Sequence, residues 1–298
     1  MESHITPQSR TFVSHRLQLH YLDWGNEGAP ILILQHGGKD HAHSWDMVAR
    51  HFARDWHVIA PDLRGHGDSA WSMDGAYASP FFVADMAALL SHLGGEPVAM
   101  VAHSLGAAVA LRQAGIMPES LTHLVAIEGL GLEDHFDRLP VEQRWQKYLK
   151  ERAVAGTRQT RRYERMEDAV DRMMEANGHL HEDLARHLTE HAVRQEADGR
   201  LAWKYDPALT LKFPEDISGA ERRALWQRID IPVWLVHGGE SWAKHPAEDG
   251  RAAEFSNAQV TSFARAGHWV QHDRFEDFVA LLDRFLRDGA NSALPDVH

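Results

Sequence analysis

Short apolar runs recur in the first and last parts of the chain, and each run ends in a polar or glycine-containing turn. Residues 10–15 and 17–23 alternate between apolar and polar positions, which is typical of strands with one exposed face. Continuous, mostly apolar runs follow at residues 31–34, 58–60, 98–101, 123–127, 233–236 and 260–263. Runs of this kind favour strands that are buried on both faces, as in parallel sheets.

Amphipathic segments lie between most of these runs and predict helices. The last of them is the clearest, because its apolar residues form one helical stripe: Phe275, Phe278, Val279, Leu282, Phe285 and Leu286. Alternating strands and helices predict an α/β fold with a mostly parallel central sheet and helices on both faces. Right-handed crossovers place the carboxyl ends of the parallel strands at one edge, where ligands bind in such folds.

One interval, residues 131–217, lacks strand-like runs and carries charged helical stretches instead. Apolar and polar positions alternate at residues 201–205, which predicts one short extended piece. The sheet pattern resumes after the interval, which disfavours a separate domain. We therefore predict a helical cap inserted into a core of residues 1–130 and 218–288, followed by a flexible tail at residues 289–298.

Composition narrows the function classes. The chain has 298 residues and no cysteine, which excludes disulfides, thiolate catalysis and cysteine-bound zinc. Its formal net charge of -12 disfavours binding to nucleic acids and to anionic membranes. No apolar run approaches the roughly 18 residues of a membrane span, and the first residues lack a secretory pattern. We expect a cytoplasmic protein that acts on a small molecule; the oligomeric state is not indicated.

A serine lies between the strand predicted at residues 98–101 and an apolar helix. A serine on such a sharp turn presents its hydroxyl group clear of the sheet. The residues two before and two after it must be small, because the strand and helix backbones nearly touch there. Ala102 and Gly106 meet this requirement around Ser104. The motif alone leaves open a second interpretation, a serine that caps the helix N-terminus.

Three further motifs surround this serine in the chain. They are His36-Gly37-Gly38 after the third strand, residues 61–69 (PDLRGHGDS) after the fourth, and Gly267-His268-Trp269 before the last helix. With these motifs in this order, nearly the whole chain resembles the α/β-hydrolase superfamily, specifically a capped, esterase-like member with a serine nucleophile. Ala102 departs mildly from the glycine that usually precedes the nucleophile by two residues.

The resemblance implies the chemistry of an acyl-enzyme. Ser104 would attack a carbonyl carbon, and His268 would accept the proton of Ser104 and later return it to the leaving group. The backbone N–H of Leu105 and that of Gly38 would form the oxyanion hole. The alternative for His268 is a surface histidine in a loop.

The acid that orients the histidine departs from the usual pattern. By resemblance it is usually an aspartate three residues after the glycine of the strand that follows the cap, and Ser241 occupies that position. Glu240 is one residue away. Glu128 ends the strand before the cap, where some dehalogenases of this superfamily place a glutamate, and an unpaired buried carboxylate there would be costly. We predict Glu128 as the acid and Glu240 as the second choice; Glu128 binding only backbone N–H groups is the alternative.

The substrate is less well specified. Trp45, His103, Trp145 and Trp203 are candidates to line the substrate site, although aromatic residues of the cap more often form its own core. The two histidines of His41-Ala42-His43 lack further ligands at zinc-binding spacing, so we expect neither a metal nor a cofactor.

Ser104 argues against haloalkane dehalogenases and epoxide hydrolases, which use an aspartate at this position. Carboxylesterase is the function we predict, as the broadest serine class. The alternatives are a lactonase, a C–C bond hydrolase, a cofactor-free haloperoxidase, or a ligand receptor with slow turnover built on the same fold.

Overall fold

The computed structural model of the protein describes residues 5–131, 139–155, 157–214 and 217–298. Within these residues the central sheet has eight strands in the order β1-β2-β4-β3-β5-β6-β10-β11. Their bounds are β1 Gln8–Ser14, β2 Leu17–Asp23, β3 Ile31–Gln35, β4 His57–Pro61, β5 Val98–His103, β6 Leu121–Ile127, β10 Val233–Gly238 and β11 Ala258–Phe263. Every strand predicted from an apolar run is present.

The direction of each strand follows its hydrophobic pattern. β1 pairs antiparallel with β2, and β2 pairs antiparallel with β4; these first two strands show the alternating pattern. The remaining neighbours are parallel, and all six residues of β5 and of β10 are buried. Strands covered on both faces need apolar residues throughout, which explains the continuous runs. The predicted mostly parallel α/β fold is confirmed.

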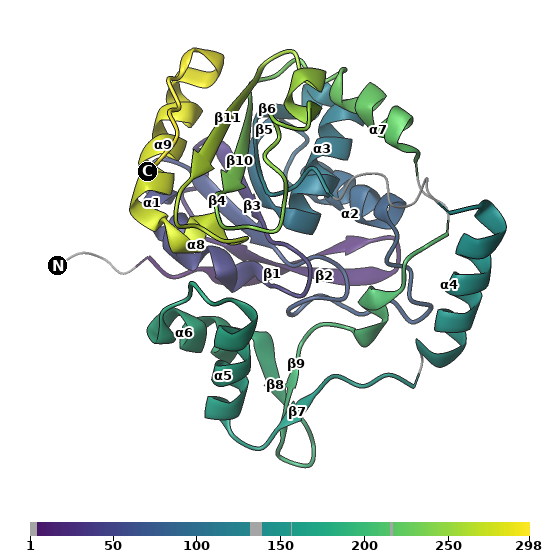
Figure 1. Cartoon of the computed structure of the whole chain (residues 1–298). Helices are drawn as coiled ribbons and strands as arrows, with labels where there is room; N and C mark the ends of the chain where they lie inside the picture. Colours follow the sequence, from purple (N-terminus) through teal and green to yellow (C-terminus); the bar gives the residue numbers. More distant parts are fainter. Residues whose placement is uncertain (1–4, 132–138, 156, 215–216) are drawn as a thin grey trace.

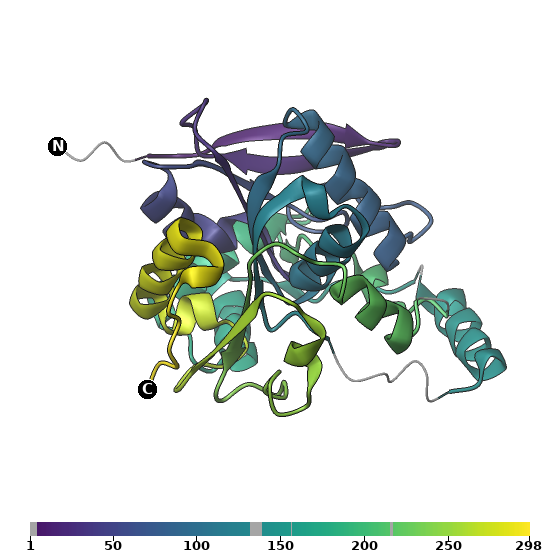
Figure 2. The ribbon, with the colours of Figure 1, turned by 90° about the horizontal axis from the view of Figure 1, so that it is seen from above.

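Helices cover the two faces of the sheet, and Figure 2 shows the two layers. One face packs against α2 (Ser79–His92), α3 (Ser104–Ile116) and α7 (Gly219–Trp226), and the other against α1 (Asp46–Phe52) and α9 (Phe275–Asp288). The apolar stripe predicted for the last helix is buried on α9, where Phe278, Leu282 and Phe285 are fully enclosed. Among the described residues, no helix is long and apolar enough to cross a bilayer.

Residues 139–155 and 157–214, which we call the middle segment, lie beyond the carboxyl ends of the parallel strands (Figure 1). Their helices are α4 (Val141–Ala155), α5 (Met166–Ala176) and α6 (Glu182–Ala192). They also contain an antiparallel sheet ordered β7-β9-β8, with β7 Arg162–Tyr163, β8 Val193–Gln195 and β9 Leu201–Trp203. The sequence indicated only the extended piece at β9. Strands of two or three residues are too short to show a period. Residues 132–138 of the predicted cap lie outside the described residues.

The end of the chain differs from the sequence prediction. Instead of a flexible tail, the chain forms the turn η5 (Gly289–Asn291) and then runs beside β11. The N–H of Val297 donates to Ser262 O at 2.9 Å, and the N–H of Ala264 donates to Val297 O at 2.7 Å. β11 is an edge strand whose outer backbone groups lack a partner in the main sheet. The prediction of a tail from residue 289 is therefore wrong.

Several histidines are enclosed where β3, β4 and β5 end. The N–H of Leu63 donates to His36 Nε2 at 3.0 Å, so His36 is neutral and its Nδ1 donates to Gly37 O at 2.7 Å. Burial lowers the pKa of His36 to about 3 and that of His66 to about 4. Burial also lowers the pKa of His103 well below the usual value. These rings remain uncharged in the folded protein at pH values where an unfolded chain would protonate them.

We expect the free energy of unfolding to fall as the pH drops from about 6.5 to about 4. The unfolded chain takes up protons at His36, His66 and His103 in this range, whereas the folded chain does not. Asp40 acts in the opposite direction, because burial raises its pKa to about 7. Burial also lowers the pKa of His41 to about 4 and that of His272 to about 3, so the histidines outweigh this carboxyl group. Urea denaturation at pH 7, 6 and 5 measures the effect. An unfolding free energy that stays constant between pH 7 and pH 5 would contradict it.

Candidate active site

Ser104 occupies a strained turn between β5 and α3. Its φ angle is 49°, in the left-handed region that costs a residue with a side chain on the order of 1–3 kcal/mol. Ser104 is the first residue of α3, and the position before the helix belongs to His103, which makes no side-chain capping bond. The residue stays partly exposed, although Ala102 and Gly106 are buried. This geometry presents the hydroxyl group at the carboxyl edge of the sheet.

Glycine is required twice around this turn. A Cβ at Gly106 would overlap the carbonyl oxygen of His36, because α3 passes directly over the loop that follows β3. A Cβ at Gly37 would lie 2.8 Å from His103 Nδ1 and 3.1 Å from the Cβ of Ser104. The loop after β3 and the turn at Ser104 are therefore in backbone contact.

Two backbone N–H groups lie beside Ser104. Leu105 belongs to the first turn of α3, where N–H groups have no carbonyl partner within the helix. A Cβ at Gly38 would be 3.8 Å from Leu105 Cδ2, so these two residues are neighbours across the turn. Within the described residues, no hydrogen bond from the N–H of Gly38 is found. The two residues predicted as oxyanion donors are thus neighbours beside Ser104.

His268 lies in the loop between β11 and α8 (Val270–Asp273). The loop is fixed by the N–H of Gly267, which donates to Asp273 Oδ2 at 2.7 Å, and by His103 Nε2, which donates to His268 O at 2.9 Å. The rings of His103 and His268 are 4.7 Å apart, and the half-exposed ring of Trp242 lies 5.1 Å from His268 on another side. The imidazole is therefore held by neighbours while its side chain stays about a quarter exposed, at 23%.

Glu128 follows β6 with a φ angle of 52°, and its side chain is fully buried. Its Oε1 accepts the N–H of Gly238 at 2.8 Å, and its Oε2 accepts the hydroxyl of Ser241 at 2.7 Å. The same Oε2 lies 3.4 Å from Nδ1 of His268. The carboxylate thus contacts both the imidazole and a backbone N–H, so the two interpretations left open by the sequence occur together.

Glu240, the second choice for the acid, points elsewhere. Its side chain is 53% exposed, and its Oε2 lies 3.4 Å from Nε2 of His179, which precedes α6 in the middle segment. Its backbone N–H donates to Ala266 O at 2.8 Å, which fixes the direction of the side chain away from the buried carboxylate of Glu128. The structure therefore brings Glu128, and not Glu240, to His268.

The part played by Ser241 was not predicted from the sequence. Ser241 occupies the position where an aspartate is usual, and its hydroxyl group supplies a hydrogen bond to Glu128. β6 and β10 are paired in parallel with Ile127 beside Val236, so the residues that follow each strand are neighbours. That pairing, once inferred from the fold family, is the signal that could have suggested a contact between Glu128 and Ser241.

The four residues predicted to line a substrate site lie in different parts of the structure, and of these four His103 adjoins Ser104. Trp45 is fully buried in the core that packs against α9, and His103 is buried beneath the His268 loop. Trp203 packs within the middle segment and donates its ring N–H to the hydroxyl of Tyr163 at 3.1 Å. Trp145 is 38% exposed on α4. Large aromatic residues serve cores more often than ligands, and this explains why the prediction for Trp45 and Trp203 is wrong.

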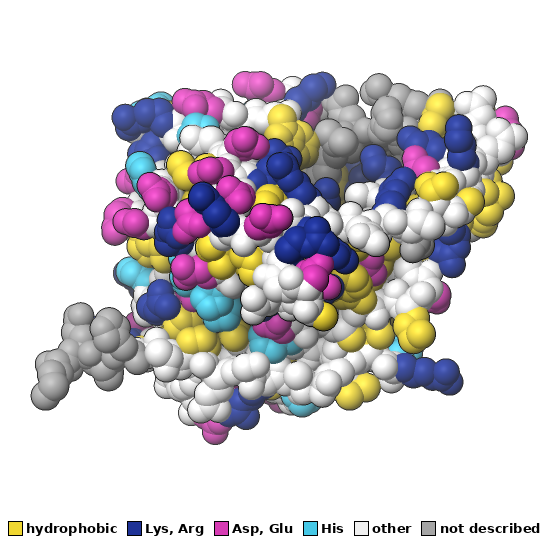
Figure 3. All heavy atoms as spheres, turned by 90° about the horizontal axis from the view of Figure 1, so that it is seen from below, with side chains coloured by type: hydrophobic (Ala, Val, Ile, Leu, Met, Phe, Trp, Pro, Cys, Tyr) yellow, Lys and Arg dark blue, Asp and Glu magenta, His cyan; other side chains and the backbone are white. Residues whose placement is uncertain are grey.

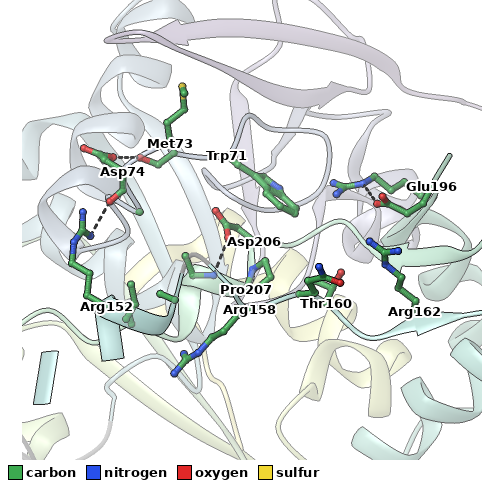
Figure 4. A pocket seen from close by; sticks show the side chains of 17 residues that line it. Trp71, Met73, Asp74, Arg152, Arg158, Thr160, Arg162, Glu196, Asp206 and Pro207 are labelled. Atoms are coloured by element: carbon green, nitrogen blue, oxygen red, sulfur yellow. Dashed lines mark hydrogen bonds and ion pairs between the residues drawn. The ribbon is translucent and has the colours of Figure 1, made fainter. Parts of the chain in front are cut away.

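One cavity is separate from this site. It measures about 470 Å³ and lies between residues 71–75 and the middle segment, and Arg152, Arg158, Arg162 and Asp206 are among the residues that line it (Figure 4). Ser104, Glu128 and His268 do not line it. The cavity therefore has no part in the chemistry that we predict at Ser104.

On the face of the molecule shown in Figure 3, acidic and basic side chains are intermixed.

Comparison with known proteins places the chain in a family. A family model described as the alpha/beta hydrolase fold matches residues 30–275. The chain belongs to the α/β-hydrolase family. An esterase of Mycobacterium tuberculosis is 30% identical over 85% of this chain and 81% of its own length. A 3-hydroxybutyrate-oligomer hydrolase of Cupriavidus necator is 28% identical over 76% of this chain and 78% of its own.

Solved structures agree on the fold. The thioesterase domain from the curacin biosynthetic pathway has a TM-score of 0.83 with this α/β hydrolase, covering 93% of this chain and 98% of the domain at 22% identity. At this identity the likeness concerns the architecture alone. The curated relatives include proteins named as esterases.

We expect Ser241→Ala to destabilise the protein by about 1–3 kcal/mol, because a buried carboxylate oxygen loses a hydrogen-bond donor. Urea denaturation of both proteins at neutral pH gives the difference. Ser120→Ala is the matched control, since the hydroxyl of Ser120 bonds the carbonyl of Met117 and the side-chain amide of Gln113 and contacts no charged group. Equal stabilities for the two variants would show that the contact between Ser241 and Glu128 contributes nothing.

Proposed function

We propose that this chain is a serine hydrolase that cleaves a carboxylic ester of a small molecule through an acyl-enzyme. The observation that carries the proposal is the buried carboxylate of Glu128, 3.4 Å from Nδ1 of His268. A buried acid beside a partly exposed imidazole, at the sheet edge that also holds a strained serine, is the arrangement that serine hydrolases require. Membership of the family and relatives named esterases support the same activity.

In the first half of the proposed reaction, Ser104 Oγ forms a bond to the carbonyl carbon of the ester. His268 Nε2 takes the hydroxyl proton, and the carbonyl oxygen becomes an oxyanion. In this proposal the N–H groups of Gly38 and Leu105 donate to the oxyanion, and donors that are already in place stabilise the charge without reorganisation. The carbon–oxygen bond to the alcohol then breaks, and the alcohol leaves with the proton from His268.

The second half reverses these roles with water. His268 accepts a proton from a water molecule as the water oxygen attacks the acyl carbon, and Ser104 leaves with that proton. The carboxylic acid is the second product. Glu128 stays ionised throughout; it accepts the hydrogen bond of Nδ1 and so keeps Nε2 directed at the reacting atoms.

We further propose that residues 131–217 act as a cap over this site. The ring of Trp269, which directly follows His268, packs against the cluster formed by Val170, Leu180 and Leu188 of the middle segment. The ring N–H of His41 also donates to Leu188 O at 2.9 Å, which joins α6 to the core. Contacts of this kind beside the imidazole support a segment that limits access to Ser104 and so selects the acyl group.

We expect Ser104→Ala to fold normally and to lower the hydrolysis of a short chromogenic ester by at least about a thousand-fold. The variant removes the only atom that forms the acyl bond. Hydrolysis of p-nitrophenyl acetate and butyrate gives the rates, and mass spectrometry after treatment with a fluorophosphonate locates the label, which should be on Ser104 alone. A label elsewhere, or an unchanged rate, would end the proposal. Tight binding of esters without turnover by the unmodified chain would favour a receptor.

We expect Glu128→Gln to lower kcat by roughly a thousand- to ten-thousand-fold, because the amide no longer holds the imidazole in the required tautomer. Glu240→Gln is the matched control and should lower kcat less than about tenfold, since its carboxylate contacts His179 and not His268. Both variants should still react with the fluorophosphonate at Ser104, more slowly in the first. Reversed effects would make Glu240 the acid.

A further inference from the structure

A second cluster of polar side chains lies where α6 of the middle segment meets the core, away from Ser104. His43 belongs to η1 (Ala42–Trp45), Asp46 begins α1, and His187 and His191 lie on α6. One donor atom each from His43, Asp46 and His191 lies within 4.8 Å of the other two. Nε2 of His187 lies 3.2 Å from Asp46 Oδ2, and Nδ1 of His43 lies 3.1 Å from the same oxygen.

The carboxylate at the centre of this cluster is buried. Only 4% of the Asp46 side chain is exposed, and Nδ1 of His43 lies 3.1 Å from both of its oxygens. The guanidinium of Arg50, which is 47% exposed, approaches Oδ2 to 3.5 Å. A buried carboxylate is costly unless a cation or several hydrogen bonds compensate it. A metal ion between the histidines would compensate the carboxylate in place of the imidazole protons.

The histidines themselves have unused nitrogen atoms. Nε2 of His187 is buried and, despite its short distance to Asp46, makes no hydrogen bond within the described residues. The ring of His191 stacks on that of His43, with centroids 3.6 Å apart, and no hydrogen bond of its nitrogens is found in the same residues. Buried polar atoms normally have partners, so the ring nitrogens of His191 and the poorly aligned Nε2 of His187 are available to a ligand.

The spacing of these residues is that of a chelating site. His187 and His191 are four residues apart on a helix, which places both side chains on one face. His43 and Asp46 are three residues apart across the start of α1 and supply the opposite side. Zinc–nitrogen and zinc–oxygen bonds of about 2.1 Å in a tetrahedral site separate the ligand atoms by about 3.4 Å. The two distances to Asp46 Oδ2 are already close to this separation.

A second group of this kind shows why the first one is different. His20, Asp62 and Asp68 also place donor atoms within 4.8 Å of one another. The oxygens of Asp62, however, already accept the N–H of Ala42 at 2.7 Å, the N–H of Asp68 at 3.0 Å and a ring nitrogen of His20 at 2.7 Å. That carboxylate accepts two backbone N–H groups, which a metal ion could not replace. Within the described residues, the carboxylate of Asp46 is approached by side chains alone, mainly by the imidazoles of His43 and His187.

We propose that His43, Asp46, His187 and His191 bind one divalent transition-metal ion, with zinc as the occupant, and that the ion ties α6 to α1. Three imidazoles and one carboxylate suit zinc and its neighbours in the transition series and do not suit magnesium or calcium, which prefer oxygen ligands. The ion takes no part in the chemistry at Ser104. It joins two segments that are more than a hundred residues apart in the sequence and thereby holds the middle segment on the core.

The test is metal binding by the full chain after exhaustive dialysis against EDTA and then against metal-free buffer. Isothermal titration with zinc chloride should show one ion per chain with micromolar or tighter affinity. Cobalt should give visible d–d absorption bands typical of a four-coordinate site. Zinc should also raise the thermal midpoint, because an ion that binds only the folded chain stabilises it.

His43→Ala and His191→Ala should each weaken zinc binding by at least about tenfold and abolish the thermal shift, since each removes one of four ligands. Asp46→Asn keeps the shape of the side chain and should do the same, so the test does not depend on a variant that misfolds. His51→Ala, which changes a histidine of α1 outside the cluster, is the matched control and should bind as the unmodified chain does. No binding by the unmodified chain, or equal losses in the control, would overturn the proposal.

Discussion

The contact between α3 and the loop after β3 is the constraint on which the rest of the site depends. The helix begins so close to the carbonyl oxygen of His36 that Gly106 has no room for a side chain. This closeness forces the chain to turn sharply at Ser104, and the left-handed φ angle is the result. Burial of β5 between β3 and β6 stabilises the strained turn. The strain of one residue is thus offset by the packing of a whole sheet.

Close packing also fixes the position of Glu128, the acid that we propose. Gly129 passes so close to Ala107 of α3 that a Cβ would overlap it, and Glu128 just before it also takes a left-handed φ angle. Its side chain then turns towards the end of the neighbouring strand β10 rather than into the helix layer. Because β6 and β10 are adjacent and parallel, a carboxylate at the end of either strand can reach the same imidazole. A serine in place of an aspartate after β10 is compatible with an acid after β6.

Much of the fold and part of the site follow from the sequence. Long, fully buried strands such as β5 and β10 leave a signal because their side chains are apolar up to the histidine near the carboxyl end. The glutamate at the end of β6 could be chosen because a charged residue at the end of a buried strand requires a partner. Other features leave no local signal: β7 and β8 are too short for a period, and the partner of β11 near Val297 is set by an open sheet edge. Trp45 is buried in the core that also contains α9, and the local sequence does not specify how these distant segments pack together.

The pairing of the last residues with β11 has a consequence for the behaviour of the protein in concentrated solution. An exposed strand edge is a template for the strands of other molecules, and proteins cover or blunt such edges to stay monodisperse. Here the terminal residues do so, with Leu294 buried against the core and the backbone of Val297 bonded on both sides to the strand. A fusion or affinity tag that pulls this segment away would expose the edge and favour self-association, so a tag on the opposite terminus is the safer arrangement.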